Sequence, residues 1–151
     1  MLKKVLLLLL IVFAVMQFIQ IDVSIPDDAN TKTDFITKYA PPEDIKLLVK
    51  NACYDCHSYQ TNYKWYMHIA PISWLTKGHV EDGRKHLNFS DWDSYTFRKK
   101  VHKLEECHEE IEHFAMPIQG YITMHEEADL SQEEREKLIN WFKDLEGSIT
   151  D

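Results

Sequence analysis

Five consecutive residues, Cys53-Tyr54-Asp55-Cys56-His57, carry the clearest chemistry in the sequence. Two thiols separated by two residues can add across the two vinyl groups of a haem, and a histidine directly after them can bind the iron. The spacing suits a helical turn, because residues three apart lie on one face of a helix. The pentapeptide therefore predicts one covalently attached c-type haem, held by Cys53 and Cys56, with His57 as an axial ligand of the iron.

Two other kinds of site use the same residue types. A structural zinc site needs further ligands, and the adjacent Cys107 and His108 are the pair that could supply them. A thioredoxin-like dithiol follows a strand in a βαβ unit, and no strand pattern precedes Cys53. We favour haem over both alternatives, and we expect Cys107 to be a lone thiol buried on a helix.

The iron of such a haem has a second axial position, for which methionine and histidine are common ligands. Met116 is the favoured candidate, because it lies 59 residues after His57 and precedes Pro117 in a break between two predicted helices. A loop stiffened by proline can hold a side chain over the far face of the ring. Met124 and His125, in the same segment between helices, are the second choice.

The apolar pattern predicts an all-α domain that positions these residues. Two prolines and two acids at 41–44 start a helix over 42–56, which carries both cysteines of the motif. Apolar residues at helical spacing predict further helices over 93–114 and 132–146, with capping sequences at Ser90–Asp93 and Ser131–Glu134. The aromatic-rich stretch 65–87 contains a proline and two glycines, so we expect short helices there. No stretch has a convincing strand pattern.

The N-terminus has the pattern of a membrane anchor. Two lysines precede an apolar run of 17 residues, Val5–Ile21, which Gln17 interrupts and which would be about 25 Å long as a helix. We interpret residues 1–21 as an uncleaved anchor helix with its lysines in the cytoplasm and the rest of the chain outside. A cleaved signal peptide has a similar pattern, but the run is not followed by a good small-x-small cleavage site.

The remainder of the chain divides into a linker and one acidic domain. Residues 22–41 are polar and predict a linker, and 42–147 form the predicted domain. The whole chain carries −8 and residues 1–21 contribute +2, which leaves −10 for residues 22–151. This charge argues against nucleic acid as a partner. It permits steering toward a redox partner protein with a basic docking surface.

A series of short stretches between about residues 42 and 142 matches, in order, the pattern of a known family. The stretches are Asn51–Ser58, Tyr63–Tyr66, Ile69–Trp74, His79-Val80, Gly83-Arg84, Leu87–Trp92, Cys107, Met116-Pro117 and Leu130-Ser131. Through them the chain resembles the small, exported, cytochrome-c-like haem-binding domain proteins of bacteria. Tyr59 and Lys64 depart from the pattern, which has asparagine and proline there, and both lie in the loop after the motif.

The resemblance implies an all-α, cytochrome-c-like domain around one haem, with further residues that contact it. Trp65 and Trp74 would form walls of the haem site, and an indole N–H could reach a propionate. Arg84 would pair with a propionate through its planar guanidinium. A single attachment motif argues against a two-haem peroxidase.

The function that we expect is one-electron transfer at the outer face of the cytoplasmic membrane, with no enzymatic reaction. In the alternative, a haem-based sensor, a weak distal ligand yields to a diatomic gas. The sequence does not identify the electron donor or acceptor.

Overall fold

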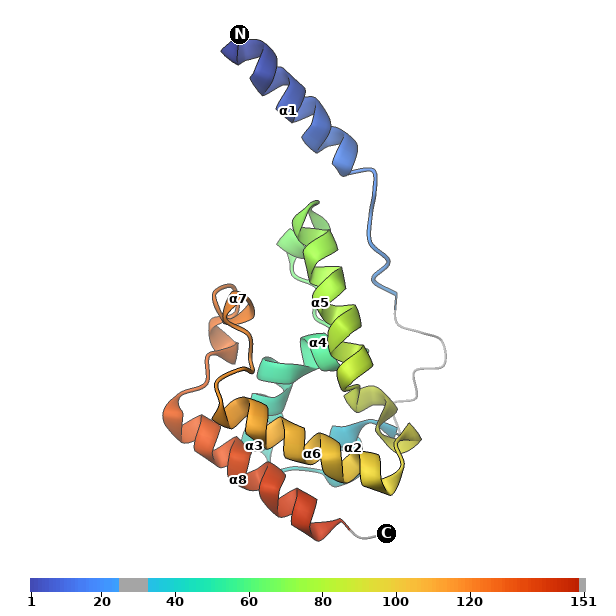
Figure 1. Cartoon of the computed structure of the whole chain (residues 1–151), viewed down its shortest axis with the longest axis vertical. Coiled ribbons are helices and arrows are strands. Elements are labelled where there is room, and N and C mark those ends of the chain that lie inside the picture. The colour runs from blue at the N-terminus through green and yellow to red at the C-terminus, as the bar shows by residue number, and fades with distance from the viewer. Residues whose placement is uncertain (25–32, 150–151) are drawn as a thin grey trace.

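The computed structural model describes residues 1–24 and 33–149, and none of these residues forms a strand (Figure 1). The predicted helical class is therefore confirmed. Residues 25–32, which belong to the predicted linker, lie outside the described residues. In chain order the helical elements are α1 (Leu2–Met16), α2 (Phe35–Tyr39), α3 (Glu43–Val49), η2 (Lys50–Tyr54), α4 (Asp55–His57), η3 (Trp65–His68), α5 (Ile72–His86), η4 (Phe89–Ser94), α6 (Phe97–Glu112), α7 (Gln119–Ile122), η5 (Glu126–Ala128) and α8 (Gln132–Ser148).

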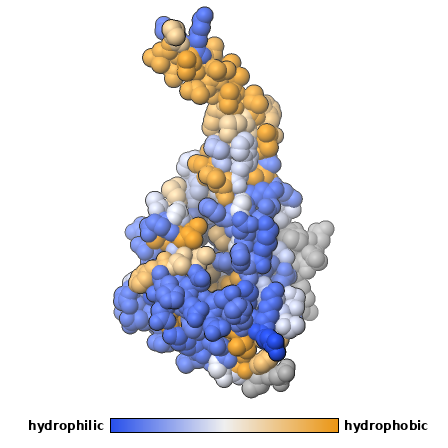
Figure 2. All heavy atoms as spheres, viewed as in Figure 1, coloured by the Kyte–Doolittle hydropathy of each residue, from blue (hydrophilic) through white to orange (hydrophobic). Residues whose placement is uncertain are grey.

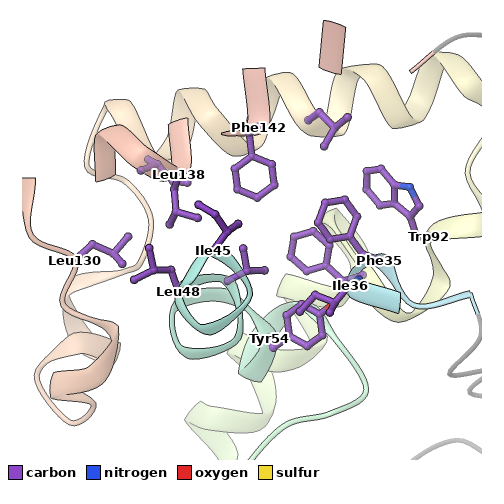
Figure 3. Close-up of a cluster of buried hydrophobic side chains, with 13 residues drawn as sticks. Phe35, Ile36, Ile45, Leu48, Tyr54, Trp92, Leu130, Leu138 and Phe142 are labelled. Carbon is purple, nitrogen blue, oxygen red and sulfur yellow. The ribbon is translucent and has the colours of Figure 1, made fainter. Parts of the chain in front are cut away.

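The hydrophobic core lies where α6 and α8 pack side by side and α3 lies against α8 (Figure 1). Apolar side chains from several helical elements converge there because each helix presents one apolar stripe. Figure 3 labels members of this cluster from α2, α3, η2, η4, α8 and the residues before α8. They are Phe35, Ile36, Ile45, Leu48, Tyr54, Trp92, Leu130, Leu138 and Phe142.

Caps define the ends of the two long helices of the core. The Ser131 side chain accepts a hydrogen bond from the Glu134 amide, and the Glu134 side chain accepts one from the Ser131 amide, which is the predicted capping box. The expected cap of α6 was the sequence around Ser90, and this expectation is wrong. Ser90 lies inside η4, and Thr96 caps α6 by accepting from the Lys99 amide.

Residues 34–40, which the sequence placed in the linker, belong to the packed domain. Asp34 caps α2, and the Tyr54 hydroxyl donates to Asp34 Oδ1 at 3.0 Å. Phe35 is completely buried, and its ring contacts Phe89 and Trp92 at centroid distances of 4.7 Å. The aromatic ring at position 35 therefore joins the N-terminal segment of the domain to the core.

The stretch 65–87 contains one long helix instead of the short helices expected from its glycines. After η3, helix α5 runs for 15 residues through Gly78 and Gly83. Glycine lowers helix stability by about 1 kcal/mol relative to alanine, a cost that packing can offset. At Gly83 the neighbouring backbone leaves no room for a side chain, so a glycine is required for α5 to pack there.

α1 extends away from the domain, and most of its side chains are exposed (Figure 1). It ends at Met16, short of the Ile21 boundary expected from the sequence. Among residues 1–24 and 33–149, no helix has both the length and the apolar character needed to cross a membrane.

Candidate haem site

The attachment motif lies in one nearly continuous helical segment. Ile45 and Leu48 of α3 point into the core (Figure 3), which fixes the direction of the segment. The π-helical turn η2 follows and contains Cys53, and α4 contains Cys56 and His57. Single π turns often occur at functional sites because they change the direction in which later side chains point. Both motif thiols are half-buried and free.

The His57 imidazole is oriented by the end of α5. Its Nδ1 lies 3.0 Å from the Gly83 carbonyl oxygen and 3.2 Å from the Leu87 carbonyl oxygen. A carbonyl can only accept, so the Nδ1–H donates and Nε2 keeps its lone pair. Burial lowers the pKa of His57, which favours the neutral ring. A neutral imidazole with a free Nε2 and a fixed Nδ1–H fits a metal-binding histidine.

The two thiols of the motif are protonated at neutral pH. Burial raises the pKa of Cys53 to about 12. Burial, reinforced by the Asp55 carboxylate, raises the pKa of Cys56 to about 11, although Arg84 opposes the shift. A catalytic dithiol needs a lowered thiol pKa, so these cysteines do not resemble a thioredoxin-like redox pair. In the described part of the chain, no group of three or more histidine, cysteine or acidic side chains is arranged to bind a metal ion.

Gly83 lets α5 pack directly on the motif. A Cβ atom at this position would lie 2.6 Å from the Cys56 carbonyl oxygen and 3.2 Å from Cys56 Cβ. Real Cβ atoms do not approach backbone oxygen that closely, so only glycine fits without a shift of α5 or α4. The same contact brings the Gly83 carbonyl within hydrogen-bonding distance of His57.

Arg84 braces the loop that follows the motif. Its Nε–H donates to the Ser58 carbonyl at 2.8 Å, and its Nη2 donates to Thr61 Oγ1 at 3.0 Å. Its guanidinium carbon lies 5.2 Å from the centroid of the Tyr59 ring, a cation–π distance. Arg84 also lies near enough to Cys56 to influence the pKa of its thiol. Its pairing with a haem propionate stays a prediction.

A hydrogen-bonded cluster that the sequence did not predict joins α7 to the motif. The Tyr121 hydroxyl donates to the Asp55 carboxylate at 2.8 Å, and the Tyr121 ring stacks on His125 at a centroid distance of 3.9 Å. His125 is 2% exposed, and its ring nitrogens lie 3.1 Å from the Tyr121 carbonyl and 3.1 Å from the Tyr66 hydroxyl. Asp55, between the two cysteines, therefore anchors the segment that includes Met124 and His125.

The backbone around Met116 is held from two sides. The Met116 amide donates to the Glu110 carbonyl at 3.0 Å, after Phe114, a residue with left-handed backbone two positions beyond the end of α6. Nη1 of the buried Arg135 donates to the Met116 carbonyl at 3.1 Å, and its guanidinium carbon lies 4.5 Å from the centroid of the Phe114 ring. The helix break predicted at Met116 is confirmed, and its side chain is half-buried.

The two tryptophans expected to contact haem lie in different surroundings. Trp65 is 74% exposed, and its ring packs edge-on against Tyr66. Trp74 is half-buried, and its indole N–H donates to the Ile19 carbonyl at 3.0 Å. The indole N–H of Trp74 therefore has a backbone partner, and a contact of either ring with haem stays a prediction.

Cys107 lies on α6 and packs against the core cluster that also contacts Cys53. Burial raises the pKa of the Cys107 thiol well above its usual value, and the neighbouring Cys53 adds to the shift. The expected position on a helix is confirmed, and the residue is half-buried where the sequence predicted a buried thiol.

Comparison with known families identifies the chain. A model described as a haem-binding domain matches residues 11–144, which include the motif, α5, Met116 and most of α8. No characterised protein and no solved structure matches the chain. Since the match covers most of the sequence, the chain belongs to the haem-binding domain family.

Proposed function

We propose that this protein is a c-type cytochrome that carries one haem covalently at Cys53 and Cys56 and transfers single electrons. His57 would be the proximal iron ligand and Met116 the distal one. The observation that carries the proposal is the His57 geometry: two backbone carbonyls hold Nδ1, which leaves Nε2 free on the turn that presents both thiols. Membership of the haem-binding domain family supports the same cofactor.

Each motif residue has a separate task in this proposal. The S–H groups of Cys53 and Cys56 would add across the vinyl groups, with sulfur joining one carbon and hydrogen the other. The carbonyls of Gly83 and Leu87 would keep the His57 ring oriented and basic. The Met116 thioether would favour the reduced state and raise the potential. When bound, a haem supplies one-electron exchange between ferrous and ferric iron.

The same proposal places the protein at the outer face of the cytoplasmic membrane, anchored through a single pass by residues 1–21. The apolar, exposed α1 and the two lysines in its first turn, Lys3 and Lys4, support this topology. The net charge of −10 on residues 22–151, from −8 for the chain and +2 for residues 1–21, supports a redox partner with a basic surface. Intact mass of the mature protein tests the anchor, and a chain that begins near Asp22 would refute it.

Covalent attachment is tested by a haem stain after denaturing electrophoresis of protein matured in a host that assembles c-type cytochromes. Wild type should stain, and Cys53→Ala and Cys56→Ala should each lose stable haem attachment. Cys107→Ala is the matched control, because Cys107 lies outside the motif, and it should stain like wild type. Haem that acid acetone extracts from wild type would refute the proposal.

The electron-transfer role is tested by the oxidised and reduced spectra and by carbon monoxide. A six-coordinate ferrous iron with Met116 bound should resist carbon monoxide. Rapid carbon monoxide binding by wild type would contradict distal ligation and favour the sensor function.

A further inference from the structure

Gln17 ties the N-terminal helix to one end of the domain. Its side-chain Nε2 donates to the Ala70 carbonyl, and its Oε1 accepts from the Ala70 amide, both at 3.1 Å. Two residues later the Ile19 carbonyl accepts from Trp74 Nε1 at 3.0 Å. Removal of residues 1–21 would leave both backbone groups of Ala70 without these partners. Each such hydrogen bond contributes about 1 kcal/mol to the stability of the folded state. Residues 17–19, which follow α1, therefore contact the domain directly.

Exposed apolar side chains surround this junction. In Figure 2 the apolar surface of α1 continues onto the adjoining end of the domain, which Figure 1 shows to be the start of α5. We call this surface the apolar rim. It consists of Phe18 (87% exposed), Ile19 (61%), Trp65 (74%), Ile72 (45%) and Leu75 (65%).

The segment that forms the domain side of the rim lacks negative charge. Residues 63–77 contain two lysines, Lys64 and Lys77, and no aspartate or glutamate, in a chain with 25 acidic residues. Aromatic and basic side chains beside an apolar surface are the composition found at the membrane–water boundary. Both lysines pair with glutamates outside the segment, Lys64 with Glu127 at 3.5 Å and Lys77 with Glu81 at 3.6 Å, so the exposed apolar and aromatic side chains are the main attraction to a lipid surface.

We propose that the apolar rim contacts the lipid surface and holds the haem domain end-on against the membrane into which α1 inserts. This inference rests on the proposed anchoring and not on the identity of the cofactor. The Gln17–Ala70 pair fixes the side of the domain that faces the lipid, because α1 leaves the domain from the rim (Figure 1). On the side of the molecule seen in Figure 2, most of the domain surface below its junction with α1 is polar, which leaves that surface for a redox partner.

The test is photolabelling of the full-length haem protein in vesicles of phosphatidylcholine and phosphatidylglycerol that contain a phosphatidylcholine with a diazirine in its acyl chain. Labelled peptides are identified by mass spectrometry. We expect label in α1 and in residues 63–76. Leu47 and Phe97, exposed apolar residues on α3 and α6, provide the background level. Label in α1 with only background label in 63–76 would overturn the inference and leave the rim for a protein partner.

Two sets of variants sharpen the result. Trp65→Ser combined with Leu75→Ser should lose the label in 63–76 and keep it in α1. Gln17→Ala should also reduce the label in 63–76, because it removes the pair with Ala70. Gln20→Ala is its matched control, since among the described residues Gln20 donates to the nearby Gln17 carbonyl and not to Ala70, and it should label like wild type. Equal labelling of the Gln17 and Gln20 variants would refute the orienting role of Gln17.

The haem spectrum of the same vesicles separates the two proposals. A normal covalent-haem spectrum without rim label overturns only the membrane contact. Rim label without covalent haem supports the contact and refutes the cytochrome. Absence of label from α1 refutes the anchor and the rim contact together.

Discussion

Replacement of Gly83 by alanine tests how α5 supports the motif. The new Cβ would lie 2.6 Å from the Cys56 carbonyl oxygen, and an ordinary contact is at least 3.4 Å, so the two helices must separate by about 0.8 Å. Overpacking of this kind costs about 1–3 kcal/mol. A similar displacement would lengthen the 3.0 Å bond between His57 Nδ1 and the Gly83 carbonyl beyond hydrogen-bonding distance.

Gly78→Ala is the matched control, because it lies in the same helix and a Cβ there meets nothing within 4 Å. Both variants gain about 1 kcal/mol of helix propensity, so their difference isolates the contact with Cys56. We expect Gly83→Ala to melt about 4–12 °C below Gly78→Ala, when unfolding is followed by circular dichroism of the haem protein. Gly83→Ala melting at or above the control would show that α5 does not need a glycine against the motif.

Three further predictions concern the distal loop and the last helix. Met116→Ala should abolish the weak far-red band of ferric haem, lower the potential and admit carbon monoxide, whereas Met124→Ala, at a residue 56% exposed, should change none of these. Arg135→Gln should weaken the same band, because its guanidinium holds the Met116 carbonyl, and an unchanged spectrum would refute that role. Ser131→Ala should cost about 1 kcal/mol in urea unfolding. Hydrogen bonds from Ser131 lower the pKa of Glu134, so the capping box stabilises the folded protein above the usual carboxyl pKa. Protonation of Glu134 at lower pH removes this stabilisation. The difference in unfolding free energy between wild type and Ser131→Ala should therefore become smaller on acidification.

Local signals explain the parts of the fold that were predictable. The helices over 42–56 and 132–146 appear at nearly the expected positions, because acids, a capping box and apolar spacing act within a few residues. The failures have non-local causes. The sequence pattern treats Gly83 as a helix breaker, yet Gly83 lies inside α5. A glycine is present there because the Cys56 backbone occupies the space that a side chain would need. Phe35 lies in a polar stretch, and its packing on distant rings of η4 and α8 makes it a core residue.

The candidate haem site likewise has residues that the sequence predicted and residues that only the fold reveals. Side chains that would react or bind metal, such as Cys53 and His57, are recognised by type and spacing. The residues that position these side chains were either not predicted from the sequence or predicted to have another role. Their partners are backbone carbonyls, which every residue type possesses, so no sequence pattern marks the pairing. Arg84 donates to the Ser58 carbonyl and Arg135 to the Met116 carbonyl. Arg135 is buried and Arg84 is half-buried, and a guanidinium removed from water needs acceptors. Each arginine finds its acceptors in a loop beside proposed haem contacts and so holds that loop in place. The proposed haem ligands can therefore keep their positions only while these loops do.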